Sequence, residues 1–522
     1  MRDVVIIGAG HNALVAACYL AREGLDVEVV ERRPVVGGAV STVERFGGYH
    51  MDVGSSAHIM IRHTGITEEL DLASVGLEYQ DLDPWGFAPF GEEAITFHLD
   101  LDQTCEGIAA VCGHADAEAY ARFATDWADR NERIFMAFQD LPTPGRLGRH
   151  LWGVGRASGV GGLELSRQFL TSGDHLLDEH FTDERLKTAL AWLGAQSGPP
   201  THEAATADLV GWNMLLHRLP PGRPRGGSGM LSVALARRLR SAGGTIRTGD
   251  GAERIIVRDS AAQGIQTTSG ERLAARTVIA GCHVLETLDL VSGAGPAWTE
   301  AAQRARQRIR VGNGIGMVVR LATSDLPHYA GSIGGKEWRA LQLIAPSRAF
   351  LRAAHGQFVA GLPPEHPAAL AMTFSAFDDT IAPPGKHNVT IWGQWHPYEL
   401  SNGEGWEQIR EREGTKLVKA VDAAAPGFAS SVERMYVQTP LDLERELGLR
   451  RGQVMHVEMT LDQMFAWRPT PELSGYRTPI TGLYLTGAST HPGGGVFGAS
   501  GRTVARLVLA DRASRRRRRR QR

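Results

Sequence analysis

Residues 4–20 read "VVIIGAGHNALVAACYL", and this stretch decides the fold. The branched apolar run at 4–7 predicts a buried strand, and the apolar spacing between residues 14 and 20 predicts a helix. Between them, residues 8–13 form the pattern G-x-G-x-x-A. A strand that stops at a glycine turn and restarts as a helix presents backbone N–H groups to an anion. The stretch therefore predicts a phosphate-binding turn.

An acidic residue at the end of the next strand strengthens this interpretation. The segment "DVEVVE", residues 26–31, predicts a strand that ends at Glu31, 23 residues after Gly8. In such a β-α-β unit Gly8 permits the tight turn, Gly10 lets a pyrophosphate approach the backbone, and Ala13 permits close helix–strand packing. Glu31 would accept hydrogen bonds from an adenosine ribose. The order of elements predicts a dinucleotide site; the alternative is an ordinary glycine-rich turn.

The following segment, "ERRPVVGGAVST" at residues 31–42, indicates which dinucleotide is bound. It places the pair Gly37-Gly38 just beyond the acid, which an NAD enzyme does not require, whereas flavoproteins use such a pair near the diphosphate. Arg32 or Arg33 would neutralise phosphate charge or be solvated. Because Glu31 would repel a 2′-phosphate, NADP is disfavoured. These residues favour FAD.

A second glycine-rich motif lies near the other end of the sequence. Residues 480–502, "ITGLYLTGASTHPGGGVFGASGR", predict a strand ending at Gly487 and a glycine turn at 493–495 that leads into a helix. Glycines between a strand and a helix let the backbone approach a flat ligand closely. This motif therefore predicts a second turn that can bind a flat ligand.

Together, "GAGHNALVAA…ERRPVVGGAVST" and "GLYLTGASTHPGGGV" resemble the phytoene desaturase-like FAD-dependent oxidoreductases. The resemblance is greatest to the branch that contains the pyridine nucleotide-disulphide oxidoreductase domain 2 type proteins and the bacterial carotene ketolases. Residues 223–249 and 375–400 are similar to that family too, so the resemblance covers nearly the whole chain.

The resemblance implies an α/β fold: a Rossmann-like FAD-binding domain of the glutathione reductase and amine oxidase type, with an inserted α+β substrate domain. The implied FAD-binding domain is discontinuous, comprising residues 1–60, 225–285 and 455–510. The implied substrate domain comprises residues 61–224, with a helical insertion, and 286–454. The last segment, 511–522, is arginine-rich and predicted to be disordered. No cysteine lies near residues 487–500, so we expect a non-covalent flavin.

The motifs and the resemblance together predict a set of cofactor-binding residues: Gly8, Gly10, His11, Asn12, Ala13, Glu31, Arg32, Gly37, Gly38, Ala39, Ala252, Gly487, Gly494, Gly495 and Val496. At Ala252 the family commonly has a bulkier valine facing the adenine. His491 is the candidate catalytic residue, as a group that tunes the flavin or carries a proton. Its alternative role is that of a turn histidine before Pro492. The four cysteines lack zinc spacing, so no metal site is predicted.

The predicted activity is removal of hydride from a C–H bond of a hydrophobic small molecule, carotenoid-like or a secondary metabolite. Three alternatives stay open: a flavin-dependent carotenoid ketolase or oxygenase, an amine oxidase-type oxidase, and a non-catalytic FAD-binding partner protein. The sequence contains no second dinucleotide-binding pattern, because "GGSGML" at 226–231 follows a loop rather than a strand. We therefore expect electrons to pass to O2, a quinone or another carrier.

Composition and charge limit the possible partners and location of the protein. A hydrophobic content of 43% with 22% charged residues is typical of a globular protein. The net charge of -2 includes six consecutive arginines, 515–520, so the rest of the chain is more acidic. There is no basic patch with interleaved aromatic residues, and no nucleic-acid partner is expected. No apolar run approaches the ~20 residues that cross a bilayer. We expect a cytoplasmic protein, with peripheral contact of the arginine run at a membrane surface as an alternative to a solvated tail.

Overall fold

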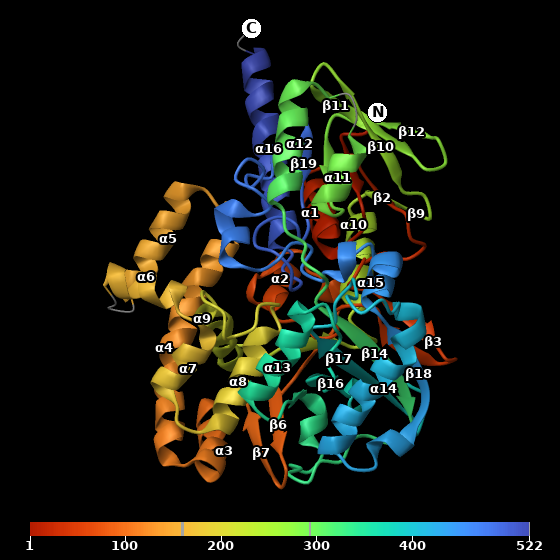
Figure 1. Cartoon of the computed structure of the whole chain (residues 1–522). Coiled ribbons are helices and arrows are strands. Elements are labelled where there is room, and N and C mark those ends of the chain that lie inside the picture. The colour runs from red at the N-terminus through yellow and green to blue at the C-terminus, as the bar shows by residue number, and fades with distance from the viewer. Residues whose placement is uncertain (158–160, 292–293, 521–522) are drawn as a thin grey trace.

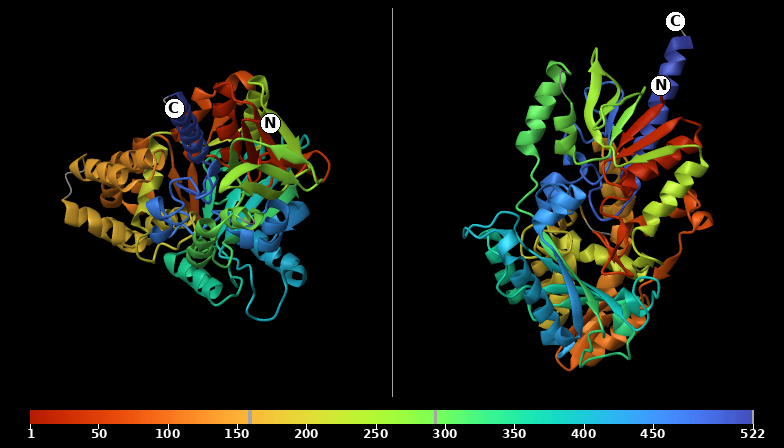
Figure 2. Two further views of the ribbon diagram at one scale, coloured as in Figure 1. Left: turned by 90° about the horizontal axis from the view of Figure 1, so that it is seen from above. Right: turned by 90° about the vertical axis from the view of Figure 1, so that its right-hand side faces the viewer.

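Two large β-sheets, one above the other in Figure 1, organise the chain. The computed structural model describes residues 1–157, 161–291 and 294–520. The upper sheet is close to both termini, and the lower sheet is flanked on one side by a group of helices; the two further views in Figure 2 show the same arrangement. The site described below lies between the two sheets.

The upper sheet is five-stranded, and all its neighbouring strands are parallel. Its order is β19-β13-β1-β2-β9. The strands are β1 (Val4–Ile7), β2 (Val27–Glu31), β9 (Thr245–Thr248), β13 (Val278–Ala280) and β19 (Leu483–Leu485). Both faces are covered, which explains why β1 and β2 are buried along their whole length rather than at alternate residues.

Helices cover one face of this sheet, and a second small sheet with two helices covers the other. The first layer comprises α1 (His11–Arg22), α10 (Met230–Ser241) and α16 (Ala499–Arg520). The second comprises an antiparallel sheet of β10 (Ala252–Arg258), β11 (Ala261–Thr267) and β12 (Arg272–Ala274), with α11 (Val284–Leu290) and α12 (Pro296–Arg308). Helix α1 packs closely on α16, because Gly501 has no side chain: a methyl group there would lie 2.1 Å from the carbonyl oxygen of Asn12.

The lower sheet has seven strands in the order β18-β14-β17-β16-β15-β6-β7. All pairs are antiparallel except β15 with β6. The strands are β6 (Gly86–Phe90), β7 (Glu93–Phe97), β14 (Gly316–Thr323), β15 (Leu341–Ile344), β16 (Ala369–Met372), β17 (His387–Gln394) and β18 (Val432–Gln438). Two-stranded ribbons complete the sheets: β3 (Thr42–Arg45) with β4 (Tyr49–Asp52), and β5 (Tyr79–Asp81) with β8 (Gly222–Pro224).

A group of helices, in orange and yellow in Figure 1, packs beside the lower sheet. It comprises α3 (Leu101–Cys112), α4 (His114–Phe138), α5 (Pro144–Ala157), α6 (Gly162–Leu170), α7 (Gly173–His180), α8 (Glu184–Ala195) and α9 (Ala207–Gly211). The other helices are α2 (Ile66–Glu69), α13 (Arg348–Val359), α14 (Trp406–Ala424) and α15 (Pro440–Leu447). Residues 116–138, within the predicted helical insertion, form most of α4. Among the described residues, no helix is long and apolar enough to cross a bilayer.

The parallel sheet draws its strands from the three segments assigned to the FAD-binding domain, and the seven-stranded sheet draws its strands from the other two segments. The domain boundaries themselves stay a prediction. The tail differs from its expected disorder: α16 continues to Arg520, while residues 521–522 lie outside the described residues. Arginine is a good helix former, and Asp511 anchors the preceding turn through an ion pair with Arg477 and a hydrogen bond from Tyr484.

A buried ionic cluster joins the two β-ribbons to the seven-stranded sheet. Asp52, at the end of β4, pairs with Arg223 from β8, and both side chains are at most 3% exposed. The other carboxylate oxygen of Asp52 accepts hydrogen bonds from the Ser228 N–H at 2.9 Å and the Thr42 hydroxyl at 2.7 Å. From β14, Arg320 donates to the carbonyl oxygens of Asp52 and Val53. Burial lowers the pKa of Arg320 to about 10.

Candidate functional site

The turn between β1 and α1 has the geometry of an anion site. Gly8 has a φ of 88°, which favours glycine. Gly10 precedes α1 in an extended conformation, and no side chain caps the helix, so its first N–H groups are available to a ligand. A methyl group added at Gly10 would meet no atom of the described residues within 4 Å. The space beside Gly10 is part of a cavity rather than of the protein core.

Ala13 faces the other way, into the fold. A methyl group at Gly281, which follows β13, would lie 2.9 Å from Cβ of Ala13. The small side chain therefore lets α1 approach the neighbouring strand, as the motif predicts.

Glu31 stands at the carboxyl end of β2 beside this turn. Its carboxylate accepts hydrogen bonds from the N–H of Ala9 at 2.7 Å and of Arg33 at 2.9 Å, and the residue is buried. The side chain is therefore held at the edge of the cavity with lone pairs left for a ligand hydroxyl. Arg32 lines the same edge and forms an ion pair with Glu286 at 3.2 Å.

The Gly37-Gly38 loop closes over the turn. The N–H of Gly37 donates to the carbonyl oxygen of Ala9 at 2.8 Å. Gly37 has a φ of 111°, and a methyl group there would lie 2.1 Å from the carbonyl oxygen of Val40. Only glycine fits at this position, and the side chains of Arg33 and Ser41 also hold the loop by donating to the carbonyl oxygen of Gly38 at 3.0 and 2.8 Å.

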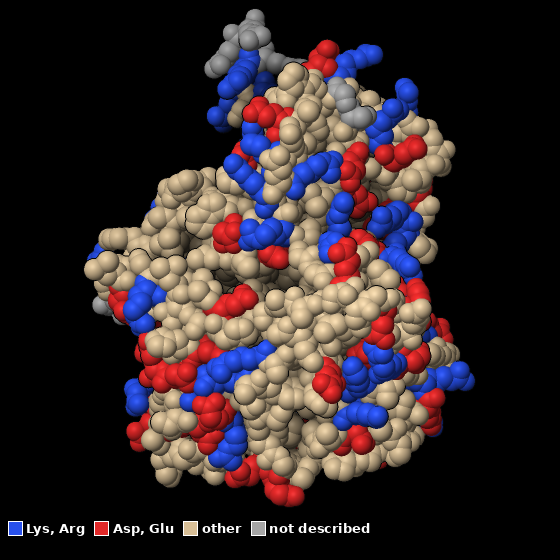
Figure 3. All heavy atoms as spheres, viewed as in Figure 1, with Lys and Arg blue, Asp and Glu red and all other residues tan. Residues whose placement is uncertain are grey.

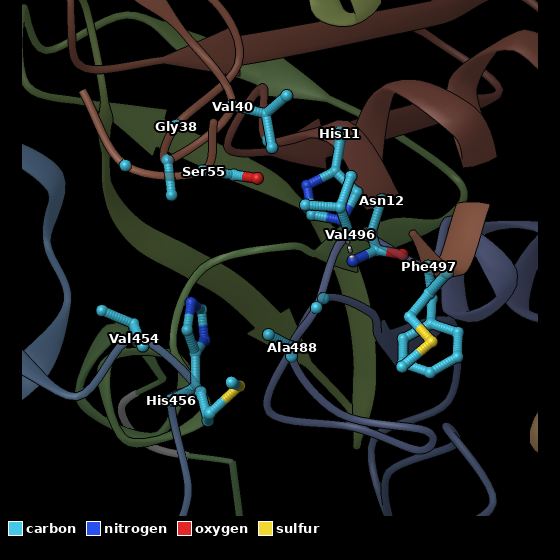
Figure 4. A pocket seen from close by; sticks show the side chains of 18 of the residues that line it. His11, Asn12, Gly38, Val40, Ser55, Val454, His456, Ala488, Val496 and Phe497 are labelled. Carbon is cyan, nitrogen blue, oxygen red and sulfur yellow. Dashed lines mark hydrogen bonds between the residues drawn. The ribbon is translucent and has the colours of Figure 1, made fainter. Parts of the chain in front are cut away.

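The glycine-rich loop after β19 reaches the same cavity from the opposite direction. Because β13 lies between β1 and β19, the carboxyl ends of all three strands meet at one edge of the sheet. Gly487 has a φ of 97°, and a methyl group there would lie 3.2 Å from the carbonyl oxygen of Gly281. The two motifs, far apart in the sequence, thus face each other across one space, as Figure 4 shows.

This space is a cavity of about 620 Å³. Figure 3 shows a hollow in the surface between the upper and lower halves of the molecule. All fifteen predicted cofactor-binding residues line the cavity: Gly8, Gly10, His11, Asn12, Ala13, Glu31, Arg32, Gly37, Gly38, Ala39, Ala252, Gly487, Gly494, Gly495 and Val496. The structure brings them together, and their role in binding stays a prediction.

His491 lies outside the cavity lining. Its ring is fully buried, its Nε2 donates to the carbonyl oxygen of Ala137 at 3.0 Å, and Phe138 and Phe465 flank the ring. Burial lowers its pKa to about 4. This placement favours the alternative role of a turn histidine before Pro492 over that of a proton carrier at the cavity surface.

Beyond the glycine loops, the cavity becomes an apolar chamber. Its lining combines helices of the insertion with strands of the seven-stranded sheet and includes these large side chains: Phe135, Phe138, Phe169, Trp212, Trp392, Met464 and Phe465. Trp392 lines the chamber, whereas Trp395 packs against Trp192 and is not part of the lining. Asp208 also lines the chamber, where Arg130 holds both of its carboxylate oxygens at 2.8 and 3.1 Å.

Sequence reasoning missed two histidines in the cavity wall, His283 and His456. Their rings stack with centroids 5.2 Å apart and planes inclined by 20°. His283 follows β13 and His456 lies in the loop after α15, so no local pattern connects residues this far apart in the sequence. Burial lowers the pKa of His283, and of His11 on the other side of the cavity, to about 4. All the cavity histidines are therefore neutral at neutral pH.

Comparison with known proteins agrees with this geometry. Residues 6–68 match the NAD(P)-binding Rossmann-like domain family. Pyridine nucleotide-disulfide oxidoreductase domain-containing protein 2 of the mouse, Mus musculus, is 30% identical, with 98% of this chain and 93% of the mouse protein aligned. The chain belongs to the phytoene desaturase-like family of FAD-dependent oxidoreductases.

Other members of this oxidoreductase family align over their full lengths. One of the limonene dehydrogenase polypeptides of Castellaniella defragrans is 25% identical, covering 98% of this chain and 94% of that protein. A neurosporene-forming phytoene desaturase of Cereibacter sphaeroides is 23% identical, covering 98% and 95%. Among solved structures, a triple mutant of putrescine oxidase superposes with a TM-score of 0.63 at 15% identity, covering 98% and 99%. The predicted fold class and the assignment as an oxidoreductase are confirmed.

Proposed function

We propose that the cavity binds FAD non-covalently and that the protein dehydrogenates a hydrophobic small molecule. One observation carries the proposal: a single cavity runs from the uncapped N-terminus of α1 and Glu31, past both glycine loops, into an apolar chamber. This arrangement fits a ligand with a diphosphate and a ribose at one end and a flat ring system at the other. The space that a side chain would fill at Gly10 is left open for such a ligand.

The protein groups divide the work of binding. The N–H groups at the start of α1 would bind the diphosphate, and Glu31 would accept a ribose hydroxyl. The apolar chamber would orient the substrate and exclude water. When bound, FAD supplies an acceptor for the hydride and its electron pair.

The charged side chains in the chamber indicate whether it suits an amine or an uncharged substrate. A protonated amine would need a free carboxylate, but Asp208 is already paired with Arg130. Burial also raises the pKa of Asp208. The chamber, as the described residues form it, is therefore suited to an uncharged hydrophobic substrate rather than to an amine. Such a substrate would be carotenoid-like or a secondary metabolite. Relatives named limonene dehydrogenase and phytoene desaturase support the same choice. The electron acceptor we propose is O2, a quinone or another carrier.

The visible spectrum of the purified protein tests cofactor binding. We expect flavin bands near about 375 and 450 nm and release of intact FAD on heating, because the binding is non-covalent. A colourless protein that does not take up FAD would contradict the proposal.

Anaerobic reduction tests the substrate class. We expect apolar isoprenoids to bleach the band of the oxidised flavin near about 450 nm. Diamines should leave this band unchanged. Isotope-labelled O2 separates the alternatives, because a dehydrogenase product gains no label and a ketolase product does. Tight FAD binding with no reduction by any member of the panel would instead indicate a non-catalytic partner protein.

We also propose peripheral contact with an anionic membrane surface. The exposed arginines at 515–518 extend α16 away from the upper sheet (Figure 1), and Trp152 on α5 and Leu163 on α6 are 65% and 92% exposed. Deletion of residues 514–522 is expected to remove the liposome binding that weakens above physiological salt. The double variant Trp152→Ser with Leu163→Ser should reduce the part of the liposome binding that salt does not weaken. Unchanged cosedimentation with anionic liposomes in both variants would refute the proposed contact.

A further inference from the structure

His456 is held in the cavity wall in an unusual backbone conformation. It has a φ of 65°, which is uncommon for a residue with a side chain and recurs at functional sites. In Figure 4 its ring stands up from the loop into the open space, with Ala488 to one side and His11 and Ser55 across the cavity. The loop thus directs one imidazole towards whatever the cavity holds.

The backbone around His456 is fixed on both sides. Arg468 donates to the carbonyl oxygens of Met455 at 2.6 Å and Val457 at 3.2 Å. His283 donates from Nε2 to the carbonyl oxygen of His456 at 2.9 Å, because its Nδ1 already accepts from the N–H of Leu285. The carbonyls of three consecutive residues are therefore held by two side chains.

A serine fixes the tautomer of His456. The buried hydroxyl oxygen of Ser489 accepts from the N–H of Val284 at 3.0 Å, and it lies 3.1 Å from Nδ1 of His456. Among the described residues, this Nδ1 is the acceptor available to the hydroxyl proton. Nδ1 of His456 accepts, so the ring proton sits on Nε2. That Nε2–H has no hydrogen-bond partner in the described part of the chain.

The surroundings keep this ring neutral. Burial, the adjacent His283 and the guanidinium of Arg468 hold the pKa of His456 well below its usual range. Arg468 is fully buried and donates to backbone carbonyls, with no carboxylate partner among the described residues. Burial lowers the pKa of Arg468 to about 9.

Resting on the proposed function, we propose that the Nε2–H of His456 donates a hydrogen bond to the bound FAD. His456 adjoins the glycine-loop part of the cavity: a methyl group at Gly494 would lie 2.5 Å from Sδ of Met455, its neighbour. FAD offers acceptor oxygens and nitrogens there, whereas a hydrocarbon substrate offers none. Ser489 is the positioning residue that presents the donor.

FAD titration of the apoprotein tests the inference. His456→Phe is expected to weaken FAD binding about 10-fold, the loss of one hydrogen bond, and to shift the visible bands of the bound flavin. His456→Asn tolerates the positive φ but cannot reach as far, so it should give the same result if the phenylalanine variant fails to fold. Ser489→Ala should weaken binding less, because it frees the tautomer without removing the ring.

His355→Phe is the matched control, because this histidine lies outside the cavity lining and should leave the affinity for FAD unchanged. Equal FAD affinity and an identical spectrum in wild type and His456→Asn would overturn the inference. So would an effect confined to the KM of the substrate. Failure of the wild-type protein to bind FAD would instead refute the proposed function, so the two failures are distinguishable.

Discussion

Gly10→Val is expected to weaken FAD binding by roughly 100-fold while leaving the protein folded. A Cβ atom at this position meets no atom of the described residues within 4 Å, and the φ of -66° and ψ of 159° suit valine. The branched side chain would instead occupy the space where we place the diphosphate. Overpacking of this kind costs up to ~3 kcal/mol, or roughly 100-fold in affinity. Titration of the apoprotein with FAD, beside a thermal unfolding curve, measures both quantities.

Gly37→Ala is the matched comparison, because its added methyl group collides with the protein itself, 2.1 Å from the carbonyl oxygen of Val40. We expect this variant to lose thermal stability, whereas Gly10→Val keeps it. If Gly10→Val bound FAD as tightly as the wild type, the open space beside Gly10 would not be the diphosphate site.

Of the substitutions proposed, Asp52→Ala is expected to lower the free energy of unfolding most. The substitution leaves Arg223 buried without its carboxylate, next to a second buried cation, Arg320. Breaking a buried ion pair by removing one partner costs about 3–5 kcal/mol. Equilibrium unfolding in urea, followed by intrinsic fluorescence, measures the free energy of unfolding.

Glu433→Ala provides the control, since its ion pair with Lys386 is about two-fifths exposed. An exposed pair contributes about 0–1 kcal/mol, so this variant should unfold almost as the wild type does. Similar losses in the two variants would show that the Asp52 cluster does not stabilise the junction between the ribbons and the seven-stranded sheet.

The dinucleotide half of the site could be predicted because its signals are local. Gly8, Gly10 and Glu31 lie within one β-α-β unit, where residue type and spacing follow directly from backbone geometry. The meeting of Gly487 with Gly8 across β13 came from the resemblance to a family, since no periodicity connects strands this far apart.

The catalytic candidate shows the limit of such reasoning. His491 stands in the right motif, but its ring points to the carbonyl oxygen of Ala137 in the helical insertion, a tertiary contact that no spacing encodes. His456 was missed for the complementary reason. Its orientation depends on Ser489, His283 and Arg468, which come from other parts of the chain. The arginine tail was predicted to be disordered, but helix α16, which is anchored at Asp511, continues through it to Arg520.

The order of strands in the parallel sheet has a consequence for biosynthesis. Strand β19, which ends two residues before Gly487, pairs with β13, whose other neighbour is β1, yet it leaves the ribosome long after those strands do. A nascent chain therefore carries one half of the nucleotide cradle and none of the other while most of the polypeptide is being translated. If the cavity binds FAD as proposed, its complete lining forms only after this strand has emerged, so we expect a chain truncated before β19 not to retain the coenzyme.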